Sequence, residues 1–70
     1  MNDKILKQSI DRLDIDVRII EFLKEKGILT IKDLTNKTKT DLKNLTLSLQ
    51  EIHKIQVELQ LLGYNLKGGL

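Results

Sequence analysis

Lysines are concentrated in one part of this sequence, where their positive charge could bind an anionic partner. Between residues 24 and 43, six lysines stand against three carboxylates, a local excess of three positive charges. The lysines are Lys24, Lys26, Lys32, Lys37, Lys39 and Lys43. Such a cluster can bind the phosphates of a nucleic acid, but it is also typical of a solvated helix face. The sequence leaves both interpretations open.

The residue sets that catalysis and metal binding require are absent from the sequence. The protein has no cysteine, and its one histidine, His53, falls on the polar side of a predicted helix without a second ligand at a fixed spacing. It contains no GxxxxGK[ST], GxSxG or HExxH motif, and its carboxylates show no pairing suited to acid and base roles. We therefore expect no enzyme activity, no catalytic residue, no metal site and no cofactor.

Length and composition indicate one small domain. The protein has 70 residues, a formal net charge of +2 and a sequence pI of about 9.0, which permits an anionic partner without demanding one. No segment approaches the roughly 20 apolar residues needed to cross a bilayer, so no membrane contact is expected. We expect a single soluble, cytoplasmic, monomeric domain over residues 1–70, with a packed arm at residues 1–13 and a frayed tail at residues 67–70.

The stretch from Asp16 to Leu34 predicts a helix, a tight turn and the start of a second helix. The apolar residues of the first helix share one face, and its charged residues share the other. The apolar set is Ile19, Ile20, Phe22 and Leu23. Gly27 is expected to end this helix in a left-handed conformation, and Thr30 is expected to cap the next one.

Three hydroxyl residues mark helix starts because each is followed by an acidic residue three positions on. The pairs are Thr30 with Asp33, Thr38 with Asp41, and Ser48 with Glu51. They predict two brief helices and then a last, longest helix near residues 49–62, which Gly63 ends. No segment alternates polar and apolar residues for long enough to form a strand. The predicted fold class is all-α, with four to five helices.

The order of these elements and three local motifs resemble the C-terminal domain of the bacterial RNA polymerase alpha subunit. The motifs are Leu13-Asp14-Ile15-Asp16-Val17-Arg18, Leu23-Lys24-x-x-Gly27-Ile28-x-Thr30 and Asp33-Leu34-Thr35-Asn36-Lys37-Thr38. The resemblance covers about residues 4–66. It implies a compact domain with two helix-hairpin-helix-like units. In that family the domain sits on a flexible tether, binds the minor groove of upstream promoter DNA and docks activators and the sigma factor.

The family's DNA contacts on the first helix are only partly present here. Arg18 matches the arginine that enters the minor groove, but Glu21 stands where the family has an asparagine. Glu21 lies one helical turn from Arg18 and can pair with it, which would hold negative charge over the DNA surface. Arg18 is therefore either a groove-reading residue or an exposed arginine paired to Glu21.

The second set of family contacts lies in a turn that reads roughly Asn-Leu-Gly-x-Lys-Ser and corresponds to residues 46–51 here. Ser48 replaces the glycine, Gln50 replaces the lysine and Glu51 replaces the serine. A glutamate at that position would occupy the open helix N-terminus and repel phosphate. The candidate DNA-binding residues are Arg18, Thr46, Ser48 and Gln50.

A candidate partner-binding surface lies on the last helix, where Val57 and Leu61 fall opposite its core stripe. Either the N-terminal arm covers them, or they form an apolar patch for a partner.

These observations predict a non-catalytic, transcription-associated binding module. The favoured hypothesis is an adaptor that contacts RNA polymerase or a transcription regulator and binds DNA weakly. The alternative is a genuine alpha-subunit domain that binds upstream promoter DNA in the minor groove.

Overall fold

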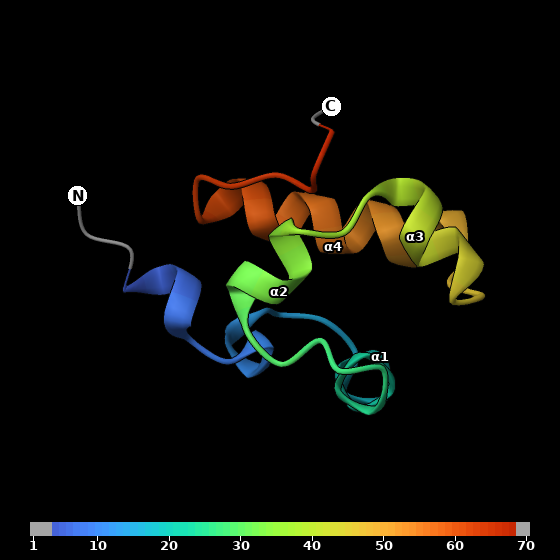
Figure 1. The fold of residues 1–70 in the computed structure, drawn as a ribbon, viewed down its shortest axis with the longest axis horizontal. Helices are drawn as coiled ribbons and strands as arrows, with labels where there is room; N and C mark the ends of the chain where they lie inside the picture. The colour runs from blue at the N-terminus through green and yellow to red at the C-terminus, as the bar shows by residue number, and fades with distance from the viewer. Residues whose placement is uncertain (1–3, 69–70) are drawn as a thin grey trace.

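The computed structural model describes residues 4–68, which form helices joined by short turns (Figure 1). The α-helices are α1 (Val17–Glu25), α2 (Ile31–Thr35), α3 (Lys39–Asn44) and α4 (Leu49–Leu61), preceded by two 3-10 helices, η1 (Ile5–Lys7) and η2 (Ile10–Arg12). The described residues contain no strand. The predicted all-α class is confirmed. The outermost parts of the expected arm and tail, residues 1–3 and 69–70, lie outside the described residues.

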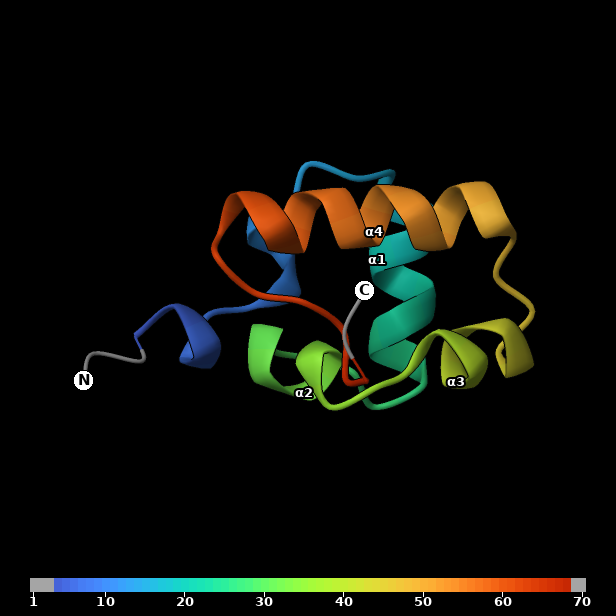
Figure 2. The same ribbon diagram turned by 90° about the horizontal axis from the view of Figure 1, so that it is seen from above.

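Helices α4 and α1 cross each other. In Figure 1, α4 is seen lengthwise above α1, which is seen end-on, and Figure 2 shows the crossing from above. Helices α2 and α3 lie on the same side of α4, to the left and to the right of α1, and the C-terminal segment returns across the connection between them (Figure 2). There the Lys67 amide donates to the Lys37 carbonyl at 2.9 Å, and Leu66 is buried. Within residues 4–68, no helix combines the length and apolar character that a bilayer span requires.

The end of α1 shows why glycine is needed at one turn. The Gly27 amide donates to the Lys24 carbonyl and the Ile28 amide donates to the Leu23 carbonyl, both at 3.0 Å. This hydrogen-bond pair is the Schellman motif, which requires a left-handed residue after the helix, and Gly27 has a φ of +84°. Ile28 is consequently turned into the core, where it is buried.

The segment before α1 is held against the α1–α2 turn by backbone hydrogen bonds. The Ile10 amide donates to the Leu29 carbonyl at 3.0 Å, and the Ile31 amide donates to the Gln8 carbonyl at 2.9 Å. Ile10 is thereby placed in the core with no exposed surface. A segment distant in sequence from α2 thus packs beside its first residue.

The core is aliphatic. The buried residues are Ile10, Leu13, Ile20, Leu23, Ile28, Ile31, Leu34, Leu42, Leu47, Ile52, Ile55, Leu59 and Leu66, and no polar or charged side chain is buried among the described residues. Helices as short as α2 and α3 would not persist alone in water, because nucleating a helix is costly. Burial of their leucines and their capped ends therefore hold them in place.

All three predicted pairs cap their helices, and each forms a reciprocal capping box. In each, the hydroxyl of the N-cap residue accepts the amide of the acidic residue three positions on, and that residue's carboxylate accepts the N-cap amide. The boxes are Thr30 with Asp33, Thr38 with Asp41 and Ser48 with Glu51. Asp16, at the start of the stretch predicted to form the first helix, caps α1. These sequence predictions succeed because a cap is a local interaction within one helical turn.

We expect Ser48→Ala to lower the free energy of unfolding by about 1 kcal/mol, because the Glu51 amide loses its acceptor at the start of α4. For a domain of this size the melting temperature should fall by roughly 4–8 °C. Thermal denaturation followed by circular dichroism measures this. Thr40→Ala, at an exposed non-cap position of α3, is the control and should change little. An unchanged melting temperature for Ser48→Ala would mean that the cap does not stabilise α4.

The capping boxes also predict how stability depends on pH. The amides of Leu29 and Thr30 lower the pKa of Asp33, and the Thr38 amide lowers the pKa of Asp41, from the ordinary value of 3.8. A lowered pKa in the folded state means that both carboxylates stabilise the fold above about pH 4 and that this contribution is lost as the pH falls through the folded values. Urea denaturation at a series of pH values should therefore show decreasing stability in acid. Asp33→Asn with Asp41→Asn should flatten that decrease; an unaltered pH dependence would contradict this cause.

Candidate binding cleft

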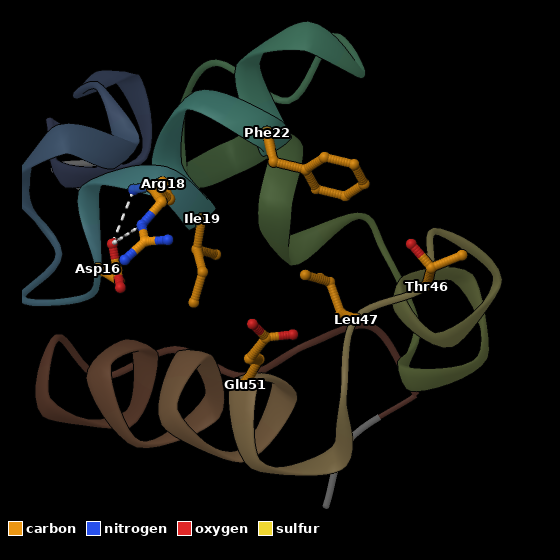
Figure 3. Close-up of a pocket in the computed structure, with 7 residues that line it drawn as sticks. All are labelled: Asp16, Arg18, Ile19, Phe22, Thr46, Leu47 and Glu51. Carbon is orange, nitrogen blue, oxygen red and sulfur yellow. Dashed lines mark hydrogen bonds and ion pairs between the residues drawn. The ribbon is translucent and has the colours of Figure 1, made fainter.

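A cleft of about 410 Å³ lies between the N-terminal half of α1 and the start of α4 (Figure 3). Its lining residues are Asp16, Arg18, Ile19, Phe22, Thr46, Leu47 and Glu51. Two regions that the sequence predicted to be functional, the start of the first helix and the turn before the last, are therefore adjacent. The volume is at the low end for small-ligand sites, which suits a few side chains of a partner rather than a large cofactor.

The loop before α1 is fixed to α4, and this sets the position of the cleft. The Asp14 amide donates to the Glu58 carboxylate at 3.3 Å, and Lys54 forms an ion pair with the other oxygen of Glu58 at 3.1 Å. Glu58 is half-buried, with 12% of its side chain exposed. Because Asp14 lies two residues before the cap of α1, this contact places the first turn of α1 against α4.

Both helix N-termini at the cleft are closed by their own side chains. The Asp16 carboxylate accepts the Arg18 amide at 2.9 Å, and the Glu51 carboxylate accepts the Ser48 amide at 2.8 Å while the Ser48 hydroxyl accepts the Glu51 amide. An anion bound at a helix N-terminus needs free amide donors there. Here carboxylates of the protein itself occupy part of that donor end, which disfavours phosphate.

Arg18 pairs with a different residue from the one expected. Its Nε lies 4.0 Å from Asp16 Oδ1, whereas Glu21 forms no ion pair within residues 4–68 and does not line the cleft. The interpretation that Arg18 pairs with Glu21 is therefore wrong. The cap position of Asp16 brings its carboxylate beside the base of the Arg18 side chain. That side chain remains 90% exposed, so the pair is weak.

Glu51 differs from the other charged residues of the cleft because it is half-buried and has no ion pair in the described part of the protein. Its carboxylate accepts one hydrogen bond, from the Ser48 amide. In Figure 3 this carboxylate points into the space between α4 and α1. The cleft therefore carries two carboxylates and one guanidinium, and Glu51 is the carboxylate that forms no ion pair among the described residues.

Apart from Thr46, the rest of the cleft wall is apolar. Ile19 and Phe22 are half-buried, and Leu47 is 9% exposed. Lys26 lies over the Phe22 ring, with Nζ 5.3 Å from the ring centroid, one turn further along α1. Sequence analysis assigned Ile19 and Phe22 to the core face and did not identify this wall. The signal available in the sequence was an aromatic residue, Phe22, near the end of the first helix. Whether such a residue belongs to the core or lines a cleft depends on where α4 lies.

Thr46 has a backbone conformation that the sequence did not reveal. Its φ is +72°, in the left-handed region that a β-branched residue rarely adopts. The Thr46 amide donates to the Lys43 carbonyl and the Leu47 amide to the Leu42 carbonyl, so α3 ends in the same motif as α1. Glycine occupies the equivalent position in the turns after α1 and α4, as Gly27 and Gly63. Thr46 is therefore a strained residue on the wall of the cleft.

Only two of the four candidate DNA-binding residues line the cleft. Arg18 and Thr46 line the cleft, Ser48 caps α4 without lining it, and Gln50 is exposed on the first turn of α4, also outside the lining. Ser48 has a φ of −73°, so this turn does not require glycine at position 48.

The candidate partner-binding residues Val57 and Leu61 have different environments. Val57 is half-buried, whereas Leu61 is 74% exposed. The other large apolar residues that are exposed in residues 4–68 are Val17, Leu29 and Leu49, which are spread over α1, the α1–α2 turn and the start of α4. Scattered exposed apolar residues are common on proteins.

Four short helices joined by tight turns, with a cleft between two helix N-termini, define a small helical binding domain. Residues 1–57 match the family described as the C-terminal domain of the bacterial RNA polymerase alpha chain. The protein is 42% identical to the DNA-directed RNA polymerase subunit alpha of Heliobacterium modesticaldum and 33% identical to that of Bacillus velezensis, over 66 residues and 93% of its length in each case. It therefore belongs to the family of bacterial RNA polymerase alpha C-terminal domains. It spans 21% of the length of these two subunits.

Thr46→Gly should stabilise the domain by about 1 kcal/mol, because glycine adopts the left-handed conformation without the steric cost that threonine incurs. Thr40→Gly is a matched control within α3, where glycine should instead destabilise by roughly 0.3–0.5 kcal/mol, because threonine is itself a weak helix former. Urea denaturation of the two variants and the unmodified protein measures both effects. Destabilisation by Thr46→Gly would show that contacts of the threonine side chain outweigh its backbone strain.

Proposed function

We propose that this protein is a non-catalytic, transcription-associated binding module that contacts RNA polymerase or a transcription regulator and binds DNA only weakly. Membership of the alpha C-terminal domain family supports the association with transcription, and the relatives above are polymerase subunits. A cytoplasmic location accompanies this proposal. The observation that supports weak DNA binding is the charge of the cleft: the positive Arg18 lines it together with the negative Asp16 and Glu51.

These carboxylates oppose DNA for an electrostatic reason. Duplex DNA carries one negative charge per roughly 1.7 Å of its axis, and proteins bind it by placing cations against the phosphates. In the cleft the Arg18 charge is partly offset by Asp16, and Glu51 adds a further negative charge. The expected affinity for duplex DNA is the non-specific range of roughly 10⁻⁴ to 10⁻⁶ M.

Several lysines of the basic segment already interact with groups of the domain. Lys24 forms an ion pair with Asp11 at 2.6 Å, and Lys26 lies over the Phe22 ring. Lys37 contributes to the lowered pKa of Asp33 and of Asp41. These contacts favour the solvated-face interpretation of the lysine cluster over a track for phosphates.

The second candidate function is direct minor-groove binding as part of an alpha subunit. The observation that favours it is the exposure of Arg18, whose side chain is 90% accessible at the edge of the cleft. An arginine in this position could leave Asp16 and extend toward a narrow groove, where negative potential is enhanced. Measured DNA affinity decides between the two candidates.

We expect Gln50→Lys with Glu51→Gln to increase DNA affinity, because the pair adds one cation, removes one carboxylate charge and keeps a side chain able to complete the capping box. Fluorescence anisotropy with an A·T-rich duplex at several salt concentrations measures affinity and its salt dependence. Each new phosphate contact should steepen the slope of log affinity against log salt by about 0.9.

A matched control has the same charge change away from the cleft: Gln60→Lys on the last turn of α4 with Glu25→Gln at the end of α1, both exposed. It should gain less affinity than the cleft variant. Adding Arg18→Ala should reverse the gain of the cleft variant. If the unmodified protein binds the duplex tightly at physiological salt and Arg18→Ala abolishes this, the minor-groove function is correct and the adaptor proposal is wrong.

A further inference from the structure

Glu51 forms a hydrogen bond but no ion pair in the described part of the protein. Burying a carboxylate without a cation is unfavourable, because the protein replaces only part of the solvation that water supplied. Glu51 is half-buried and accepts one hydrogen bond at Oε1 from Ser48, while the other cleft carboxylate, Asp16, has Arg18 beside it. An incoming cation would therefore be stabilised most strongly at Glu51.

The apolar wall lies next to this carboxylate. Ile19, Phe22 and Leu47 line the same cleft as Glu51, and Figure 3 shows all four side chains directed into the space between α1 and α4. Lys26 covers the Phe22 ring one turn further along α1, so its charge disfavours a second cation at that end. The cleft thus has a polar half that accepts a cation and an apolar half that accepts an uncharged side chain.

We infer that this cleft binds a short basic segment of a partner protein, with an arginine or lysine on Glu51 and an adjacent aliphatic side chain against Ile19, Phe22 and Leu47. This inference rests on the protein-contacting function proposed above and names the chemistry of the partner. A phosphate backbone fits less well, because it would bring negative charge against Glu51 and offers no apolar group for the wall. A metal ion fits less well too, because no metal-binding cluster occurs among residues 4–68.

The test uses isotope-labelled protein and three end-blocked peptides observed by NMR. The first is Gly-Gly-Arg-Leu-Gly-Gly, the second replaces the arginine with glutamate, and the third replaces leucine with alanine. The basic peptide with leucine should shift the amide signals of Ile19, Phe22, Leu47 and Glu51. The acidic peptide should shift none of them, and the alanine peptide should bind more weakly than the leucine peptide because it loses apolar contact.

Glu51→Gln is the decisive variant, because glutamine also completes a capping box and only the charge is lost. Binding of the basic peptide should weaken about fivefold at low salt, the factor expected for one close charge pair in water. Glu25→Gln changes the charge by the same amount at an exposed position outside the cleft and should leave the affinity within about twofold. The melting temperatures of both variants verify that the fold is retained.

Several outcomes would overturn the inference. These are equal shifts with the acidic and basic peptides, shifts confined to residues outside the cleft, or no effect of Glu51→Gln on binding. Cleft signals that move with protein concentration alone would identify a second copy of the protein as the occupant. An A·T-rich duplex that shifts the same signals at lower concentration than the peptide would identify DNA.

The two failures are distinguishable. Tight, Arg18-dependent DNA binding would refute the proposed function itself. Weak DNA binding together with no basic-peptide binding would leave the protein-contacting function in place and refute only the chemistry assigned to this cleft.

Discussion

Ser48 and Glu51 exchange hydrogen bonds at 3.1 Å and 2.8 Å, and this reciprocal contact determines both where α4 begins and what the cleft contains. Because the Ser48 amide is held by the Glu51 carboxylate, the longest helix starts at a defined residue, and its stripe of Ile52, Ile55 and Leu59 is buried in the core. The same bond orients the carboxylate beside the apolar wall. A fold-stabilising interaction is therefore also the source of the negative charge that distinguishes this cleft.

The other helices depend on the same kind of local closure combined with burial. Helices α2 and α3 are too short to persist alone, so each needs a capping box at its start and a leucine in the core. The turns that follow α1, α3 and α4 share one hydrogen-bond pattern, and glycine relieves its strain in the first and third. At Thr46 the strain remains, beside the cleft, where backbone strain often marks a functional residue.

The charge balance of the cleft is the physical basis of the proposal that this member of the family binds DNA only weakly. Helix N-termini attract phosphate through free amides and positive potential. Here Asp16 and Glu51 accept amides at those ends, and the exposed Arg18 has a carboxylate beside it. The scaffold of the family is retained while the electrostatic requirement for phosphate is weakened. The proposed contact with a basic, partly apolar protein segment follows from the same arrangement of charges.

The sequence by itself determined where the helices begin and which family the protein resembles. Asp16, Thr30, Thr38 and Ser48 act within one helical turn of their own positions, so their roles do not depend on distant residues. The tertiary structure decided which residues face each other: it paired Arg18 with Asp16, made Phe22 a cleft wall and left Glu51 without an ion pair among the described residues. These outcomes depend on how α4 crosses α1, and contacts across this crossing, such as the Asp14–Glu58 hydrogen bond, join residues too far apart in sequence for a local pattern to reveal.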